Sequence, residues 1–100
     1  MPARSFDKPH KQRHNDIMAN VTLDLEAAKQ LGGLPERIKS RVANIIERLG
    51  DWPEVSGAKP LRGELAGHYR IRTGDYRLQF RVQGEEVIIE RMGHRDRFYE

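Results

Sequence analysis

The stretch HYRIRTGDYRLQFRVQ, residues 68–83, has the pattern of two β-strands joined by a turn. Apolar Tyr69 and Ile71 alternate with polar residues before the turn Thr73-Gly74-Asp75. Leu78 and Phe80 alternate with polar residues in the same way after it. Successive side chains of a strand point to opposite faces of a sheet, so the apolar set is predicted to face a core. The polar set then shares the other face, which we name the arginine face: His68, Arg70, Arg72, Arg77, Gln79 and Arg81.

The segments on either side extend this hairpin into a larger sheet. After the turn at residues 83–85, residues 87–92 give a third strand pattern. It contains consecutive Val87, Ile88 and Ile89, which is typical of a central strand partly covered on both faces. Nearer the N-terminus, residues 19–25 alternate apolar and polar side chains and predict another strand. The sequence therefore predicts an antiparallel three-stranded meander preceded by one earlier strand.

Helices are predicted between the first strand and the meander. A short helix is expected at residues 26–31, where Gly32-Gly33 can end it, and a longer one follows from residue 36 to residue 49. The expected fold is α+β: strand, helix, helix, a loop at residues 54–67, and the meander, with the helices packed on one face of a small sheet. The longer helix carries one continuous apolar stripe: Ile38, Val42, Ile45, Ile46 and Leu49.

The length and composition of the chain bound its organisation and its chemistry. With 100 residues, of which 37% are hydrophobic and 33% charged, the chain is expected to form one domain with a modest core. We expect a flexible extension at residues 1–17 and a folded domain at 18–100. The absence of cysteine excludes disulfides and thiolate catalysis. No stretch resembles a membrane span or a signal peptide, so a cytoplasmic protein without a membrane partner is expected.

The N-terminal segment contains one pair of residues with metal-binding spacing. His10 and His14 are four residues apart, as zinc-binding histidines on a helix are. No carboxylate or further histidine nearby completes a site. We therefore expect neither a metal site nor a cofactor.

The chemistry of the arginine face points to phosphate. The planar guanidinium donates two parallel hydrogen bonds and keeps its charge at any working pH. Exposed arginines are often only solvated, but like charges opposite one another destabilise a sheet, and such a cluster is typically retained for a ligand. The two strands of the hairpin contribute no acidic residue to this face. Further basic residues lie before and after the hairpin in the sequence: Lys59, Arg62, His94, Arg95 and Arg97. Tyr99, near the end of the sequence, is the other reactive group.

Three motifs occur in a family-specific order along residues 20–99. They are KPLRG at 59–63, HYRIRTGDYR at 68–77 and GHRDRFY at 93–99. Together they resemble the successive signatures of the RelE/ParE superfamily of toxins from type II toxin–antitoxin systems. The resemblance implies a RelE-like fold, a cognate antitoxin protein as partner and the ability to form a toxin–antitoxin hetero-oligomer.

In the RelE branch, the resemblance implies metal-independent cleavage of messenger RNA on the ribosome, with the 2′-hydroxyl attacking the adjacent phosphodiester. On the matching positions, Tyr99 is the candidate base, Arg77 the phosphate stabiliser and Arg95 the acid or leaving-group stabiliser. His94 is the alternative base, because histidine titrates near neutrality. The remaining candidates are expected to bind RNA: Lys59, Arg62, His68, Arg70, Arg72, Arg81 and His94.

Other functions remain compatible with the same residues. The ParE branch poisons DNA gyrase and cleaves no RNA, but its members generally lack the arginine and tyrosine constellation. A non-catalytic RNA- or ribosome-binding module would also carry a basic face. In either branch an amphipathic antitoxin segment is expected to pack on the apolar rim of the helices or on a strand edge.

Overall fold

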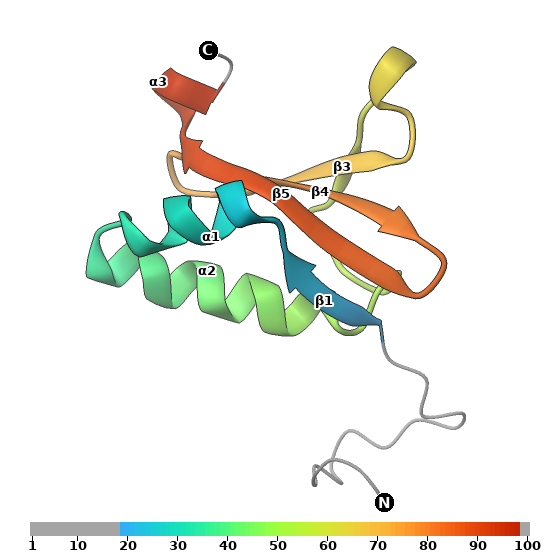
Figure 1. Ribbon diagram of the computed structural model, residues 1–100, viewed down its shortest axis with the longest axis horizontal. Coiled ribbons are helices and arrows are strands. Elements are labelled where there is room, and N and C mark those ends of the chain that lie inside the picture. Colours follow the sequence, from blue (N-terminus) through green and yellow to red (C-terminus); the bar gives the residue numbers. More distant parts are fainter. Residues whose placement is uncertain (1–18, 99–100) are drawn as a thin grey trace, which may run out of the picture.

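A computed structural model describes residues 19–98 as a mixed sheet with helices packed against it (Figure 1). The predicted extension at residues 1–17, with His10 and His14, lies outside the described residues. The helices are α1 (Leu25–Gly32), α2 (Glu36–Leu49) and α3 (Arg95–Phe98), and the 3₁₀ turn η2 covers Gly63–Leu65. The strands are β1 (Asn20–Leu23), β2 (Lys59–Pro60), β3 (His68–Thr73), β4 (Tyr76–Gln83) and β5 (Glu86–His94).

The strands of this sheet lie in the order β1-β5-β4-β3-β2. The predicted meander is confirmed, because β3, β4 and β5 pair in antiparallel fashion in sequence order. β1 pairs with β5 in parallel, which the intervening helices allow by returning the chain to the same end of the sheet. β5 is therefore the interior strand that its apolar run predicts.

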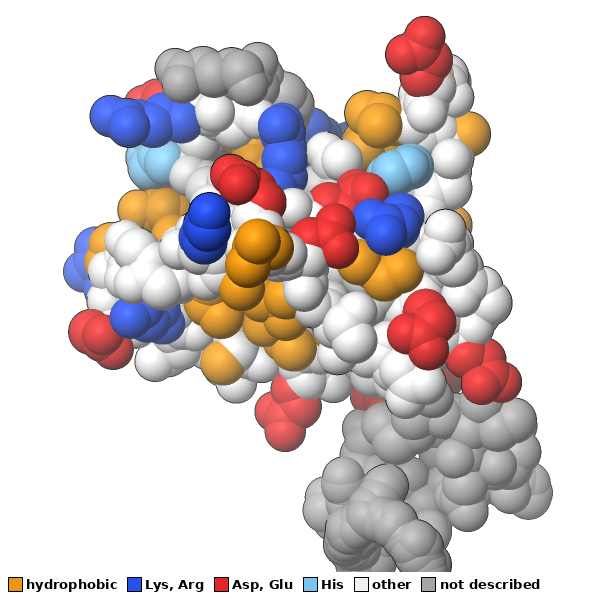
Figure 2. Space-filling model, viewed as in Figure 1, with side chains coloured by type: hydrophobic (Ala, Val, Ile, Leu, Met, Phe, Trp, Pro, Cys, Tyr) orange, Lys and Arg blue, Asp and Glu red, His pale blue; other side chains and the backbone are white. Residues whose placement is uncertain are grey.

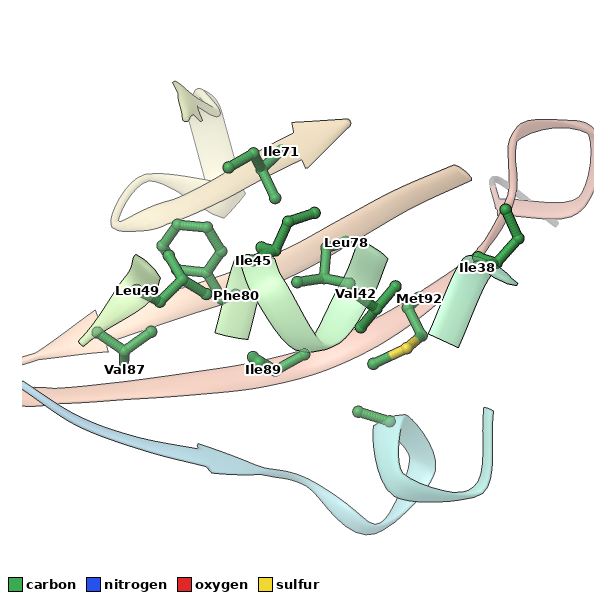
Figure 3. Close-up of a cluster of buried hydrophobic side chains, with 11 residues drawn as sticks. Ile38, Val42, Ile45, Leu49, Ile71, Leu78, Phe80, Val87, Ile89 and Met92 are labelled. Carbon is green, nitrogen blue, oxygen red and sulfur yellow. The ribbon is translucent and has the colours of Figure 1, made fainter. Parts of the chain in front are cut away.

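The core lies between α2 and one face of the sheet (Figure 3). The predicted stripe of α2 is confirmed in its main positions, since Val42 and Leu49 are at most 1% exposed. Leu78 and Phe80 of β4 are buried to the same degree on the facing side of the sheet. The Trp52 ring extends this packing, with its centroid 5.4 Å from that of Phe80 in an edge-on arrangement. The apolar half of the strand alternation thus faces the helices, as predicted.

Some boundaries differ from the sequence-based prediction. The first strand ends at Leu23 because the chain turns at Asp24, whose carbonyl accepts the Ala28 amide at 2.9 Å and starts α1. Alternation predicts that Leu25 continues the strand, but it is 73% exposed on the first turn of α1. β2 and η2 occur within the predicted loop, and the sequence pattern does not predict α3. These elements have between two and four residues, too few to show a hydrophobic period.

Among residues 19–98, no helix has the length and apolar character needed to cross a membrane. The same residues contain no group of three or more histidine, aspartate or glutamate side chains placed to hold a metal ion.

Candidate nucleic-acid interface

The arginine face is the side of the sheet turned away from α2 (Figure 1). The strand register arranges its side chains in rows across β3, β4 and β5. One row runs through Arg72, Arg77 and Gly93, and the next through Arg70, Gln79 and Arg91. The third runs through His68, Arg81 and Ile88. Lys59 lies opposite Arg70 in β2 and widens the second row at the edge of the sheet.

A carboxylate occupies the end of the arginine face near His68 and Arg81. Glu90 is the extra residue of a β-bulge in β5, because Gln79 pairs with Arg91 while the adjacent Phe80 pairs with Ile89. The bulge turns the Glu90 side chain onto the arginine face. Its Oε1 lies 2.8 Å from His68 Nδ1 and accepts a hydrogen bond of 2.9 Å from Gln79 Nε2.

Arg81 completes this network. Its Nη1 donates to Glu90 Oε2 at 3.0 Å and to Asp24 Oδ2 at 3.3 Å. Burial raises the pKa of Glu90, but the hydrogen bonds from Gln79, His68 and Arg81 outweigh it and leave that pKa below its usual value. The hydrogen bond to Glu90 is the main reason that the pKa of Arg81 is raised. Glu90 is therefore ionised at neutral pH and compensates Arg81.

The two strands of the hairpin contribute no acidic residue to this face, as expected, but Arg81 nevertheless has two acidic neighbours. That expectation covers carboxylates only within the two strands of the hairpin, whereas the counter-charges come from β5 and from the β1–α1 junction. Figure 2 shows acidic side chains among the basic ones and histidine on the visible surface above β5. The positive charge of the face is therefore concentrated at its other end.

That other end carries Arg72 and Arg77, which are directly opposite each other in the β3–β4 register. Arg77 is half-buried, and its Nε has no hydrogen-bond partner in the described part of the chain. The position opposite Arg77 in β5 is Gly93, and a Cβ built there would have no atom within 4 Å. An unpaired buried donor beside open space is costly unless a ligand satisfies it. The arrangement is suited to a phosphate group at Arg77.

α3 borders this end of the face. The Arg95 amide donates to the Asp75 carbonyl of the β3–β4 turn at 2.7 Å, which fixes the start of the helix. The Arg95 side chain is 59% exposed, and its Nε lies 3.9 Å from both the Asp75 and the Asp96 carboxylates. It is therefore held close to the turn between Arg72 and Arg77. Tyr99, the predicted base, lies outside the described residues and directly follows Phe98.

His94 is not brought onto the arginine face. It pairs with Tyr76 in the β4–β5 register, one position beyond the Arg77 row, and so its side chain points to the opposite side of the sheet. Its ring packs edge-on against Tyr76 with centroids 5.2 Å apart, and its Nδ1 accepts the Asp96 amide at 3.1 Å. This placement favours a structural role for His94. Arg62 lies exposed at the start of η2, at the far margin of the face.

Arg91 is a member of the arginine face that the sequence pattern does not predict. Simple alternation from the buried Ile89 would turn Arg91 toward the core, but the bulge at Glu90 turns Arg91 outward instead. Its Cζ lies 4.2 Å from the centroid of the Phe98 ring, and its Nη2 donates to the Phe98 carbonyl. A bulge has no reliable signal in a single sequence, so pattern reasoning does not find this residue.

Comparison with known proteins places the chain among toxins. The model of the family described as "ParE toxin of type II toxin-antitoxin system, parDE" matches residues 21–99. The chain belongs to this toxin family. The resemblance of its motifs to the RelE/ParE superfamily is thereby confirmed. Toxin RelG of Mycobacterium tuberculosis is 39% identical to the toxin described here over 83 residues, which are 79% of this chain and 93% of RelG.

Two further comparisons also match the chain to toxin–antitoxin systems. Toxin RelE3 of Methanocaldococcus jannaschii is 32% identical over 75 residues, which cover 72% of the toxin and 85% of RelE3. The crystal structure of the RelBE2 toxin–antitoxin complex of M. tuberculosis contains a chain that superimposes with a TM-score of 0.68 at 36% identity. That match covers 78% of the toxin and 92% of the other chain, and it confirms the predicted RelE-like α+β fold.

Proposed function

We propose that the toxin is an endoribonuclease that cuts messenger RNA on the ribosome. The observation that carries the proposal is the unpaired, buried Arg77 Nε beside the open space at Gly93, on a sheet face that also presents Arg72. The relatives named RelG and RelE3 support the RelE branch. Because ribosomes are its site of action, the cytoplasm is the proposed location.

The proposed reaction uses residues of the chain alone. Tyr99 takes the proton from the 2′-hydroxyl, and the 2′-oxygen attacks the adjacent phosphorus. Arg77 stabilises the negative charge that develops on the non-bridging oxygens. The bond from phosphorus to the 5′-oxygen then breaks. Arg95 stabilises the departing oxygen by a hydrogen bond, and that oxygen takes a proton from solvent water. The products are a 2′,3′-cyclic phosphate and a free 5′-hydroxyl.

The other basic residues are proposed to hold the RNA rather than to react. Arg72 lies in the same row as Arg77 and Arg70 in the next row, and Lys59 and Arg62 continue the basic surface toward the sheet edge. Such contacts neutralise phosphates and give binding a strong salt dependence. His68 and Arg81 are proposed to contribute less, because Glu90 already engages both.

A cognate antitoxin is the proposed protein partner. The matched M. tuberculosis chain was crystallised as a toxin–antitoxin complex. In the toxin described here, Leu25 is exposed on α1, and Figure 2 shows hydrophobic side chains gathered over that helix. An amphipathic antitoxin segment packing there would cover this apolar surface.

Inhibition of DNA gyrase is the second candidate function, because the matching family model is described by the ParE name. Parallel assays separate the two. Purified toxin is added to a translation extract with a defined messenger RNA, followed by primer extension, and to a gyrase supercoiling reaction. The proposal predicts cleavage in the extract and normal supercoiling. Inhibited supercoiling with intact messenger RNA would assign the toxin to the gyrase branch, and ribosome binding without cleavage would make it a non-catalytic module.

A further inference from the structure

α3 is too short to be stable without support. It comprises Arg95–Phe98, and an isolated helix of that length does not form in water. Its start is fixed by the hydrogen bond from the Arg95 amide to the Asp75 carbonyl at 2.7 Å. Its end must therefore be held by other contacts, and these involve Phe98.

Phe98 is buried away from the main core. It is only 4% exposed, yet it is not a member of the hydrophobic cluster between α2 and the sheet. Its ring lies under the guanidinium of Arg91, with Cζ 4.2 Å from the ring centroid. The same guanidinium donates through Nη2 to the Phe98 carbonyl. Arg91 thus holds both the side chain and the backbone of the last described residue.

We propose that Arg91 is a positioning residue, which fixes the end of α3 beside the arginine face and thereby places the next residue, Tyr99, for the cleavage step. The claim that Arg91 fixes the end of α3 does not depend on the proposed nuclease function. The claim that Arg91 places Tyr99 for cleavage rests on that function. Arg91 lies diagonally across the β4–β5 pair from Arg77, in the adjacent row. The residue that anchors α3 is therefore next to the proposed phosphate site.

The contacts explain why an arginine is required at this position. A flat guanidinium can stack on an aromatic ring and donate in its own plane to a carbonyl at the same time. A lysine ammonium has no plane, so it keeps the charge but cannot make both contacts with the same geometry. Arg91→Lys should accordingly retain part of the effect, and Arg91→Met should lose it while keeping a side chain of similar bulk.

The first test measures α3 directly and does not depend on activity. ¹⁵N relaxation is recorded for the Arg97 and Phe98 amides of the full chain. In the wild type, order parameters of about 0.85 are expected, as in rigid backbone. Arg91→Met should lower them below about 0.6, and Arg91→Lys should give intermediate values. The control Arg37→Ala, at an exposed position of α2, should change nothing. Unchanged order parameters in Arg91→Met would overturn the proposal.

The second test links α3 to cleavage. At saturating ribosome concentration, Arg91→Met should lower the single-turnover rate at least tenfold and change ribosome affinity less than threefold. Adding Arg91→Met to Tyr99→Phe should lower the rate less than twofold further, because the group that Arg91 positions is already lost. A full tenfold loss in the Tyr99→Phe background, or a loss of affinity alone, would contradict a positioning role. If the wild-type toxin cuts no RNA, the proposed function fails, while the order parameters still decide whether Arg91 holds α3.

Discussion

Arg77 and Arg72 face each other across β3 and β4, but their surroundings differ. Arg77 is half-buried with an unpaired Nε, whereas Arg72 is exposed. A buried, preorganised donor stabilises charge that develops during a reaction, and an exposed cation mainly attracts the polyanion.

We therefore expect Arg77→Ala to lower the single-turnover cleavage rate at saturating ribosomes at least tenfold, or about 1.4 kcal/mol of transition-state stabilisation. Arg72→Ala should instead weaken binding and reduce its salt dependence, with the saturated rate retained. Rates and affinities measured across a salt series check this division. Equal losses of affinity in both variants, with unchanged saturated rates, would show that the face only binds.

Tyr99 and His94 are the competing candidate bases, and His94 packs against Tyr76 on the side of the sheet opposite the arginine face. Tyr99→Phe keeps the ring and removes the ionisable oxygen, so it should bind ribosomes normally and lose most of the single-turnover rate. His94→Ala should keep more of that rate. A nearly normal Tyr99→Phe together with an inactive His94→Ala would reverse the assignment.

Alternation along the hairpin is sufficient, from the sequence alone, to place Arg70, Arg72 and Arg77 on one face of the sheet. It is not sufficient for Glu90 and Arg91. Both point outward because a bulge adds one residue to β5, and this extra residue depends on strand pairing rather than on local sequence. The sequence therefore predicts the positive charge of the face but not the carboxylate that compensates one end of it.

At the scale of elements, the Glu90 network joins β3, β4, β5 and the β1–α1 junction on one face of the sheet. Glu90→Gln replaces a half-buried anion by a neutral group and should lower the free energy of unfolding by about 1–2 kcal/mol at pH 7. It should also strengthen RNA binding, because Arg81 is released. Urea titrations and binding measurements check both effects, with Glu85→Gln in the exposed β4–β5 turn as the control. Weaker RNA binding in Glu90→Gln would contradict the compensating role.

The pH dependence of that stability difference has a definite sign. The pKa of Glu90 is lower in the folded protein than its ordinary value of 4.5, so the folded state favours the charged form. The stabilisation is complete above pH 4.5 and is lost as the pH falls through the lower folded pKa. The difference between wild type and Glu90→Gln should therefore shrink below pH 4.5, and a difference that grows on acidification would be inconsistent with this network.

Long elements with a clear period are predicted from the sequence, and short ones are not. α2 and β4 have 14 and 8 residues, enough for their apolar periods to be read directly. β2 has two residues and α3 has four, and both depend on contacts with residues remote in sequence. α3 matters most for the site, because its contacts with Arg91 and Asp75 exist only in the folded sheet.

At the scale of the whole molecule, the fold separates two tasks. α2 covers one side of the sheet and encloses the core, and the opposite side presents the arginine face (Figure 1). Leu25 directly follows Asp24, which accepts a hydrogen bond from Arg81, so the proposed antitoxin surface on α1 borders the compensated end of the arginine face. Arg72 and Arg77 lie at the other end of that face. Substituting Leu25→Ser should weaken antitoxin binding at least tenfold and leave cleavage of messenger RNA unchanged, as measured by calorimetry and by the translation assay. Unchanged antitoxin affinity would move the docking surface elsewhere.

The central claim, transesterification by the 2′-hydroxyl, is tested most directly by the chemistry of the cut ends. Messenger RNA fragments from toxin-treated ribosomes are recovered and their new termini are identified by mass spectrometry. We predict a 2′,3′-cyclic phosphate on the upstream fragment and a 5′-hydroxyl on the downstream fragment, both formed at least tenfold more slowly when Arg77→Ala replaces the wild type. A 3′-hydroxyl with a 5′-phosphate, the products of attack by water with departure of the 3′-oxygen, would contradict the account.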